Sequence, residues 1–166
     1  MAWGLELFQT KGLHWWHHVV PGESHVTVAY RSVHDGLREI FREYAVPPPI
    51  VLTGDLPGLE AHLARASGIY GYEVEAPEGL LNSMGYVRLG YFDDVEGAIS
   101  NFRRYVELHP ASANAYNGLA DALEAAGEFE DALSNREEAV RLAEQTGDER
   151  LEDFLRKRDA LREREE

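Results

Sequence analysis

Apolar residues recur every three or four positions over most of the chain after residue 30, which is the spacing of an amphipathic helix. Residues 32–44 keep this spacing, with Ser32 placed as the N-cap of the predicted helix. Residues 57–69 keep it as well. A last charged stretch carries its apolar residues on one side: Leu151, Phe154, Leu155 and Leu161. The pattern therefore predicts a mainly α-helical protein.

One run has a different pattern. Residues 13–20, LHWWHHVV, are aromatic and β-branched and are followed by Pro21-Gly22, so we predict one strand there. Three consecutive prolines predict an extended linker at residues 46–56, because proline disfavours helix. The predicted organisation is a small α/β N-terminal part over residues 1–45, the linker 46–56, and a helical domain over residues 57–166.

The helical domain contains an internal repeat. Residues 80–110, LLNSMGYVRLGYFDDVEGAISNFRRYVELHP, align with residues 116–144, YNGLADALEAAGEFEDALSNREEAVRLAE, as two helix–turn–helix units of about 34 residues. The first unit has one extra residue in its turn, GYFDDVEG. Small, large and turn positions agree between the units: Leu81, Gly85, Ala98, Phe102 and Pro110 in the first, and Tyr116, Leu119, Ala120, Leu123, Gly127, Ala132 and Ala139 in the second.

This pattern resembles the tetratricopeptide repeat. The resemblance implies stacked helical hairpins whose concave surface binds a protein or peptide. Glu144 stands where such repeats usually have a proline, which predicts that the last helix continues past it. We interpret the final charged helix as the polar cap that a stack of repeats needs.

Charge and composition narrow the possible functions. The chain has 166 residues and a net charge of −14, and residues 57–166 account for −12 of it with 24 acids and 12 bases. Such a field repels phosphate backbones, so nucleic acid is not an expected partner. The absence of cysteine excludes disulfides and thiolate zinc sites. No apolar run reaches the roughly 18 residues of a membrane span, and we predict a cytoplasmic protein.

The N-terminal part has a second resemblance. Residues 14–41, HWWHHVVPGESHVTVAYRSVHDGLREIF, resemble the C-terminal end of the α/β-hydrolase family, in the branch of esterases related to enterochelin and bacillibactin esterases. In this comparison ESH matches the histidine motif and SVHDGLREIF the last helix. Residues 59–86 also resemble bacterial esterases of this branch that carry a helical extension. The resemblance implies that His25 corresponds to the histidine of a catalytic triad.

The rest of a triad is not found. No serine of the chain stands in a G-x-S-x-G motif, and only 24 residues precede His25, too few for the sheet, nucleophile and acid that come first in this fold. General acid–base catalysis alone contributes roughly 10² to 10⁴ in rate. We therefore predict an interaction or scaffold module that carries the tail of an esterase and is not catalytically complete alone. The alternative is a carboxylic-ester hydrolase whose nucleophile and acid lie upstream or on another chain.

Other candidate residues receive structural interpretations. His14 and His18 would face one way on a strand and His17 the other, so we expect no metal site, and no cofactor is implied. We expect His62 and His109 to pack or lie on the surface, and His34 to be exposed.

The remaining predictions concern a group of aromatic residues, a group of acidic residues and the oligomeric state. Core packing is the expected role of an aromatic group: Trp15, Trp16, Tyr70, Tyr72, Tyr86, Tyr91 and Phe92. Asp93, Asp94 and Glu96 are interpreted as a solvated turn rather than a calcium loop. The unpaired edges of a strand at residues 13–20 predict a homodimer through the N-terminal segment.

Overall fold

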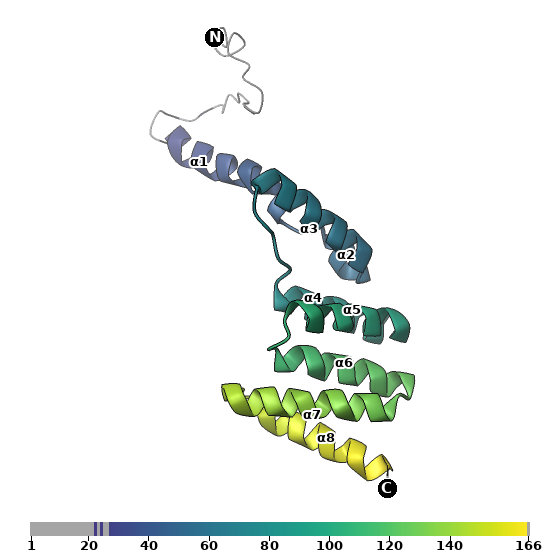
Figure 1. The fold of residues 1–166 in the computed structure, drawn as a ribbon. Helices are drawn as coiled ribbons and strands as arrows, with labels where there is room; N and C mark the ends of the chain where they lie inside the picture. The colour runs from purple at the N-terminus through teal and green to yellow at the C-terminus, as the bar shows by residue number, and fades with distance from the viewer. Residues whose placement is uncertain (1–21, 23, 25–26, 166) are drawn as a thin grey trace. The chain divides into compact units, whose positions relative to one another are not determined.

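The computed structural model describes residues 22, 24 and 27–165 (Figure 1). It is mainly α-helical, as the sequence predicts, and it divides after Arg42 into two units, Met1–Arg42 and Glu43–Glu166. The predicted strand at residues 13–20 lies outside the described residues, and so does the dimer interface predicted there.

Helix α1 (Thr27–Ile40) belongs to the first unit. The prediction that Ser32 is its N-cap was wrong, because the helix begins at Thr27 and Ser32 lies inside it. The Val28 N–H donates to the Ser24 carbonyl oxygen at 2.9 Å, which starts the helix earlier. A 3₁₀ turn, η2 (Arg42–Tyr44), follows.

A short helix, α2 (Pro48–Thr53), occupies the stretch predicted as an extended linker. The expectation that the prolines prevent a helix was wrong because Pro48 and Pro49 occupy its first turn. Backbone N–H groups have no intrahelical partner there, so proline costs nothing. The helix ends at Gly54, whose φ of 61° is a left-handed conformation that favours glycine.

Helix α3 (Leu56–Tyr70) matches the helix predicted at residues 57–69. Asp55 caps its first turn by accepting the Gly58 N–H at 3.1 Å. The helix buries Leu59, His62 and Ala66 on one face, so His62 has the packing role that its position predicts.

The remaining helices pack on one another in chain order. These are α4 (Glu78–Tyr86), α5 (Val95–Leu108), α6 (Ala113–Ala126), α7 (Phe129–Thr146) and α8 (Leu151–Glu165). Figure 1 shows them as a stack from α4 and α5 to α8. Helix α7 runs past Glu144, as the missing proline predicts.

The Phe102 side chain of α5 packs between α4 and α6. Its ring is fully buried, and a Cβ added at Gly85 of α4 or at Gly118 of α6 would lie closer than 3.0 Å to it. The Tyr86 ring packs edge-on against Phe102 with 5.0 Å between centroids. The two glycines therefore allow the aromatic ring to fill the space between neighbouring helices.

The extra residue of the first repeat is accommodated in a π-helical turn, η3 (Val87–Tyr91), that directly continues α4. The Phe92 N–H reaches back five residues to the Val87 carbonyl oxygen at 3.2 Å. Buried Asn101 of α5 then donates to the carbonyl oxygens of Met84 at 3.2 Å and of Gly54 at 3.0 Å. This amide connects α5 to the ends of α2 and α4.

Helix α8 covers the last hairpin. Phe154 and Leu161 are buried at 2 % and 1 % exposure, and Leu151 and Leu155 are partly buried. Its other side carries charges. The interpretation of this helix as the polar cap of a repeat stack stays a prediction.

We expect Gly85→Ala and Gly118→Ala each to destabilise the protein by about 2 kcal/mol or more, because overpacking a filled core typically costs about 1–3 kcal/mol and no space exists beside Phe102. Gly68→Ala in α3 is the control, since a Cβ there meets nothing within 4 Å. This control should stabilise by about 0.5–1 kcal/mol. Urea unfolding measures all three, and equal effects would contradict the packing described.

Candidate binding site

The predicted catalytic residue His25 lies outside the described residues, as do His14, His17 and His18. His34 lies in α1 with its side chain 60 % exposed, as predicted. Among the described residues, no group of three histidine or acidic side chains is arranged to hold a metal ion.

Ser112, His109 and Glu78 come together but do not form a catalytic triad. Ser112 Oγ donates to Glu78 Oε2 at 2.6 Å, and Tyr105 Oη donates to the same oxygen at 2.8 Å. His109 Nε2 faces the Ala76 carbonyl oxygen at 3.0 Å, and its Nδ1 lies 4.0 Å from Glu78 Oε1. The serine hydroxyl contacts the Glu78 carboxylate directly, and the His109 imidazole is not placed between the two as it is in a triad. The hydrogen bond from Ser112, opposed by partial burial and assisted by Tyr105, lowers the pKa of Glu78 and keeps it an acceptor.

The described aromatic residues divide into separate groups. Tyr86 packs in the core against Phe102, as predicted. The expectation of core packing was wrong for Tyr72, Tyr91 and Phe92, which are 54 %, 82 % and 45 % exposed. These exposed rings pair with neighbouring rings instead of entering the core. Tyr72 stacks on Tyr70, and the Tyr91 and Phe92 rings meet edge to face.

Asp94 does more than a solvated turn residue would. It is the N-cap of α5, accepting the Gly97 N–H at 2.9 Å, and it also accepts from Arg88 Nη1 at 2.7 Å. The hydrogen bonds from Gly97 and Arg88 lower the pKa of Asp94. Its role is structural.

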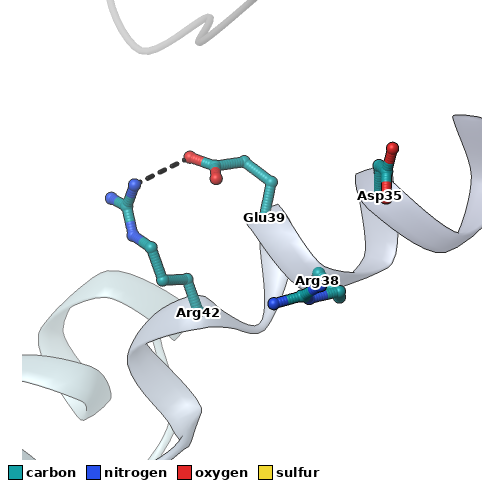
Figure 2. A pocket seen from close by; sticks show the side chains of 4 residues that line it. All are labelled: Asp35, Arg38, Glu39 and Arg42. Atoms are coloured by element: carbon teal, nitrogen blue, oxygen red, sulfur yellow. Dashed lines mark hydrogen bonds and ion pairs between the residues drawn. The ribbon is translucent and has the colours of Figure 1, made fainter.

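A hollow on the surface of α1 offers little to a ligand. It is lined by Asp35, Arg38, Glu39 and Arg42, and Figure 2 shows the last two joined by an ion pair. The distance from Arg42 Nη1 to Glu39 Oε1 is 2.9 Å. The lining residues that the structure describes are charged side chains of both signs, whereas small-molecule sites are mostly apolar.

The strongest polar cluster surrounds Asp121 of α6. Its carboxylate accepts from Tyr86 Oη of α4 at 2.7 Å, from Arg136 Nη2 of α7 at 2.7 Å, and from Lys157 Nζ of α8 at 3.1 and 3.2 Å. One side chain therefore connects four helices of the stack.

Arg136 is fully buried. Its Nη1 donates to the Asn117 side chain and, at 3.3 Å, to the Asn117 carbonyl oxygen, while its Nη2 also lies 3.7 Å from Glu124 Oε2. Its Nε has no hydrogen-bond partner in the described part of the chain. A buried guanidinium requires partners of this kind because an unpaired charge is very costly away from water.

The surroundings of Asp121 and Tyr86 shift the pKa values of both groups. Burial raises the pKa of Asp121, but the charge and hydrogen bond of Arg136, with help from Tyr86 and Lys157, outweigh it and lower the pKa. Burial and the Asp121 charge raise the pKa of the Tyr86 hydroxyl, which therefore remains a donor. Arg136 and Lys157 both pair with Asp121, and Glu124 pairs with Arg164 at 2.8 Å, so these charges all have partners of opposite sign.

Two partly buried amides lie on the same helices, α4 and α6, as Tyr86 and Asp121. Asn114 Nδ2 of α6 donates to Asn82 Oδ1 of α4 at 2.9 Å. A side-chain amide has two N–H donors and an oxygen with two lone pairs, so this bond occupies only part of their capacity. Together with Tyr86, Asp121 and Lys157, they define what we call the α4–α6–α8 face. Such a surface can hydrogen-bond the backbone of an extended polypeptide.

Sequence reasoning did not single out Asp121, Arg136 or Lys157. One signal was available in the alignment of the repeats. Phe102 follows Ala98 by four residues, and Arg136 follows Ala132 by four, so a charged residue stands where the first repeat buries an aromatic ring. Asp121 and Glu124 on the preceding helix could have supplied its partners.

We expect Asp121→Asn to destabilise the protein by about 3–5 kcal/mol at pH 7, because it leaves the buried Arg136 charge without its main partner. Asp159→Asn, which removes a surface partner of Arg158, is the control and should cost under about 1 kcal/mol. The pKa of Asp121 is lowered in the folded state, so its contribution is present above the unfolded pKa of about 3.9 and is lost as pH falls through the folded value. The difference between wild type and Asp121→Asn should therefore shrink in urea unfolding at pH 3, and a difference independent of pH would contradict this account.

No helix in the described part of the chain has both the length and the apolar character to cross a bilayer. Comparison with protein families, with curated proteins and with solved structures finds no match for this chain.

Proposed function

We propose that this protein is an interaction module of the tetratricopeptide-repeat type that binds an extended segment of a partner protein on its α4–α6–α8 face. The observation that carries this proposal is the Asn82–Asn114 amide pair, which bridges α4 and α6 at 2.9 Å and is partly, not fully, buried. Neutral amides suit the recognition of peptide backbone, which also presents neutral donors and acceptors.

The rigidity of this face supports the proposal. Asp121 fixes the relative positions of α4, α6 and α8 through Tyr86 and Lys157. Groups held in place before binding lose less conformational entropy when the partner arrives. The amide pair is therefore presented by helices that do not have to rearrange.

The repeat pattern supports the assignment to this class. The small residue of α4 is Gly85 and that of α6 is Ala120. The small residues of α5 and α7 are Ala98 and Ala132, and all four are buried. Helix α8 supplies the cap. A stack of this kind needs about three repeats for stability, and α8 together with α2 and α3 supplies the additional packing surface.

Under this proposal the chain does not hydrolyse esters by itself, and the esterase resemblance concerns its ancestry. Nothing in the described part of the chain favours a hydrolase. The cytoplasmic location and the homodimer through residues 13–20 stay predictions.

We expect a photo-crosslinking amino acid at Gly79 to capture a partner. Gly79 lies one turn before Asn82 on α4, and a side chain there meets nothing within 4 Å. Asn82→Ala with Asn114→Ala should reduce the yield about tenfold, because two hydrogen bonds at about 0.5–1.5 kcal/mol each are lost. The same amino acid at Gly68 of α3, also in open space, is the control. Equal yields from both positions, or no effect of the double substitution, would contradict the proposed face.

We expect the purified chain to cleave 4-nitrophenyl acetate no faster than its His25→Ala variant. The reason is that an imidazole without a nucleophile and oxyanion donors lacks most of the catalytic contributions of a triad. The release of 4-nitrophenolate measures the rate, and the variant corrects for the background reaction of the other six histidines. A hundredfold loss in His25→Ala would instead support the esterase alternative.

A further inference from the structure

A cleft of about 370 Å³ lies within the second unit, away from the α4–α6–α8 face. Helix α3 forms one wall, the segment Glu73–Ala76 another, and α4 and α5 contribute the rest. Its volume falls in the range of roughly 300–1,000 Å³ that is usual for ligand sites. Its apolar lining comes from leucines, alanines and a valine: Leu56, Leu59, Leu63, Ala64, Val74, Ala76, Leu81 and Leu108.

The segment Glu73–Ala76 belongs to no helix or strand, but exposed and buried side chains alternate along it. Val74 and Ala76 are buried at 6 % and 2 %, whereas Glu73 and Glu75 are exposed. The Val74 N–H donates to Ser67 Oγ at 2.8 Å, and the Ala76 carbonyl oxygen pairs with His109 Nε2 at 3.0 Å. The segment is thus fastened to the protein through alternate residues, as a strand is.

The intervening residues have unused backbone groups. In the described part of the chain, neither Glu73 nor Glu75 makes a backbone hydrogen bond. The alternating burial and bonding indicate an extended segment. Successive residues of such a segment direct their backbone groups to opposite edges, so we expect Glu73 and Glu75 to present donors and acceptors on the edge opposite to that used by Val74 and Ala76. An exposed edge of this kind can pair with an added strand.

The charges of the cleft select the partner. Among the described residues, the acids that line it are Glu60, Glu73 and Glu75, against one cation, Arg104. Arg104 is already engaged, since its Nε lies 2.9 Å from Glu60 Oε1 and its Nη1 2.9 Å from Glu107 Oε2. Glu73 and Glu75 make no ion pair among the described residues. The cleft therefore carries a net charge of −2 beside a leucine-rich floor.

We propose that this cleft binds an extended basic peptide in which Lys or Arg alternates with a leucine-like residue. The peptide adds as a strand to the free edge of Glu73–Glu75. Its apolar side chains enter between Leu63 and Leu108, and its cationic side chains pair with Glu73 and Glu75. This is a second binding site, independent of the amide face.

The test uses the full chain and a fluorescein-labelled probe, acetyl-LKLKLK-amide, followed by fluorescence anisotropy. Wild-type protein should bind it, and the double variant Glu73→Lys, Glu75→Lys should bind at least tenfold more weakly. Both side chains are exposed, so this variant should fold normally. The matched control Glu144→Lys, Glu163→Lys changes the net charge equally at two other exposed acids, and it should retain most of the affinity. An equal loss in both variants would show attraction to an acidic protein in general and would overturn the proposal.

Strand addition has its own readout. Two probes with N-methyl groups on alternate backbone amides, one for each edge of the peptide, keep the same charge and side chains. Only the probe methylated on the pairing edge should lose binding, and hydrogen exchange at the Glu73 and Glu75 amides should slow with the unmethylated probe. Equal binding by both methylated probes would overturn strand addition. Asn82→Ala with Asn114→Ala should leave probe binding unchanged, which separates this site from the proposed function.

Discussion

The ion pair between Arg136 and Asp121 constrains the helical stack more than any other contact. A fully buried guanidinium has to find its partners within the protein, and Asn117, Asp121 and Glu124 of α6 provide them. Because Asp121 also binds Tyr86 of α4 and Lys157 of α8, satisfying one buried charge fixes four helices together. The proposed amide face inherits its geometry from this arrangement, since Asn82 and Asn114 lie on two of those helices.

The two repeats solve the same packing problem with opposite chemistry. In the first, Phe102 fills the space next to Gly85 and Gly118 and needs only apolar contact. In the second, Arg136 takes the equivalent position and needs hydrogen bonds as well. An aromatic ring tolerates any apolar neighbour, whereas the guanidinium requires acceptors at fixed places. The second repeat thereby gains specificity in how α8 docks, because Lys157 also pairs with Asp121.

Much of the helical architecture could be predicted from the sequence, and its failures have identifiable causes. Periodicity was sufficient for α3 and for the stack, because those helices bury one face. The prediction failed for α2, because we treated proline as a helix breaker at every position. Pro48 and Pro49 stand in the first turn of the helix, where proline is tolerated. The start of α1 was also misplaced. Ser32 could cap a helix that begins there, but α1 already begins at Thr27, so Ser32 lies inside it.

The candidate sites were harder to predict than the fold, since they depend on contacts between residues far apart in the chain. Asp121 and Lys157 are 36 residues apart, and nothing local to either one indicates their pairing. The cleft likewise needs α3, α5 and the segment at residues 73–76 together. Glu73 and Glu75 look like ordinary surface acids in the sequence, and the proposed edge was inferred only from the hydrogen bonds of Val74 and Ala76.

Charge separates the two proposed binding surfaces, and α4 keeps them independent. On the amide face each cation of the Asp121 cluster has a carboxylate, whereas the cleft has two acids without a cation. Leu81 lines the cleft while its neighbour Asn82 belongs to the amide face, so α4 contributes to both. The helix is held near its start by Glu78 and at its end by Tyr86, through hydrogen bonds to residues on other helices or turns. A peptide on one side can influence the other only by moving α4 against these anchors, and the buried packing of Phe102 on Gly85 opposes that movement. The physical expectation is therefore two sites that are occupied without cooperativity.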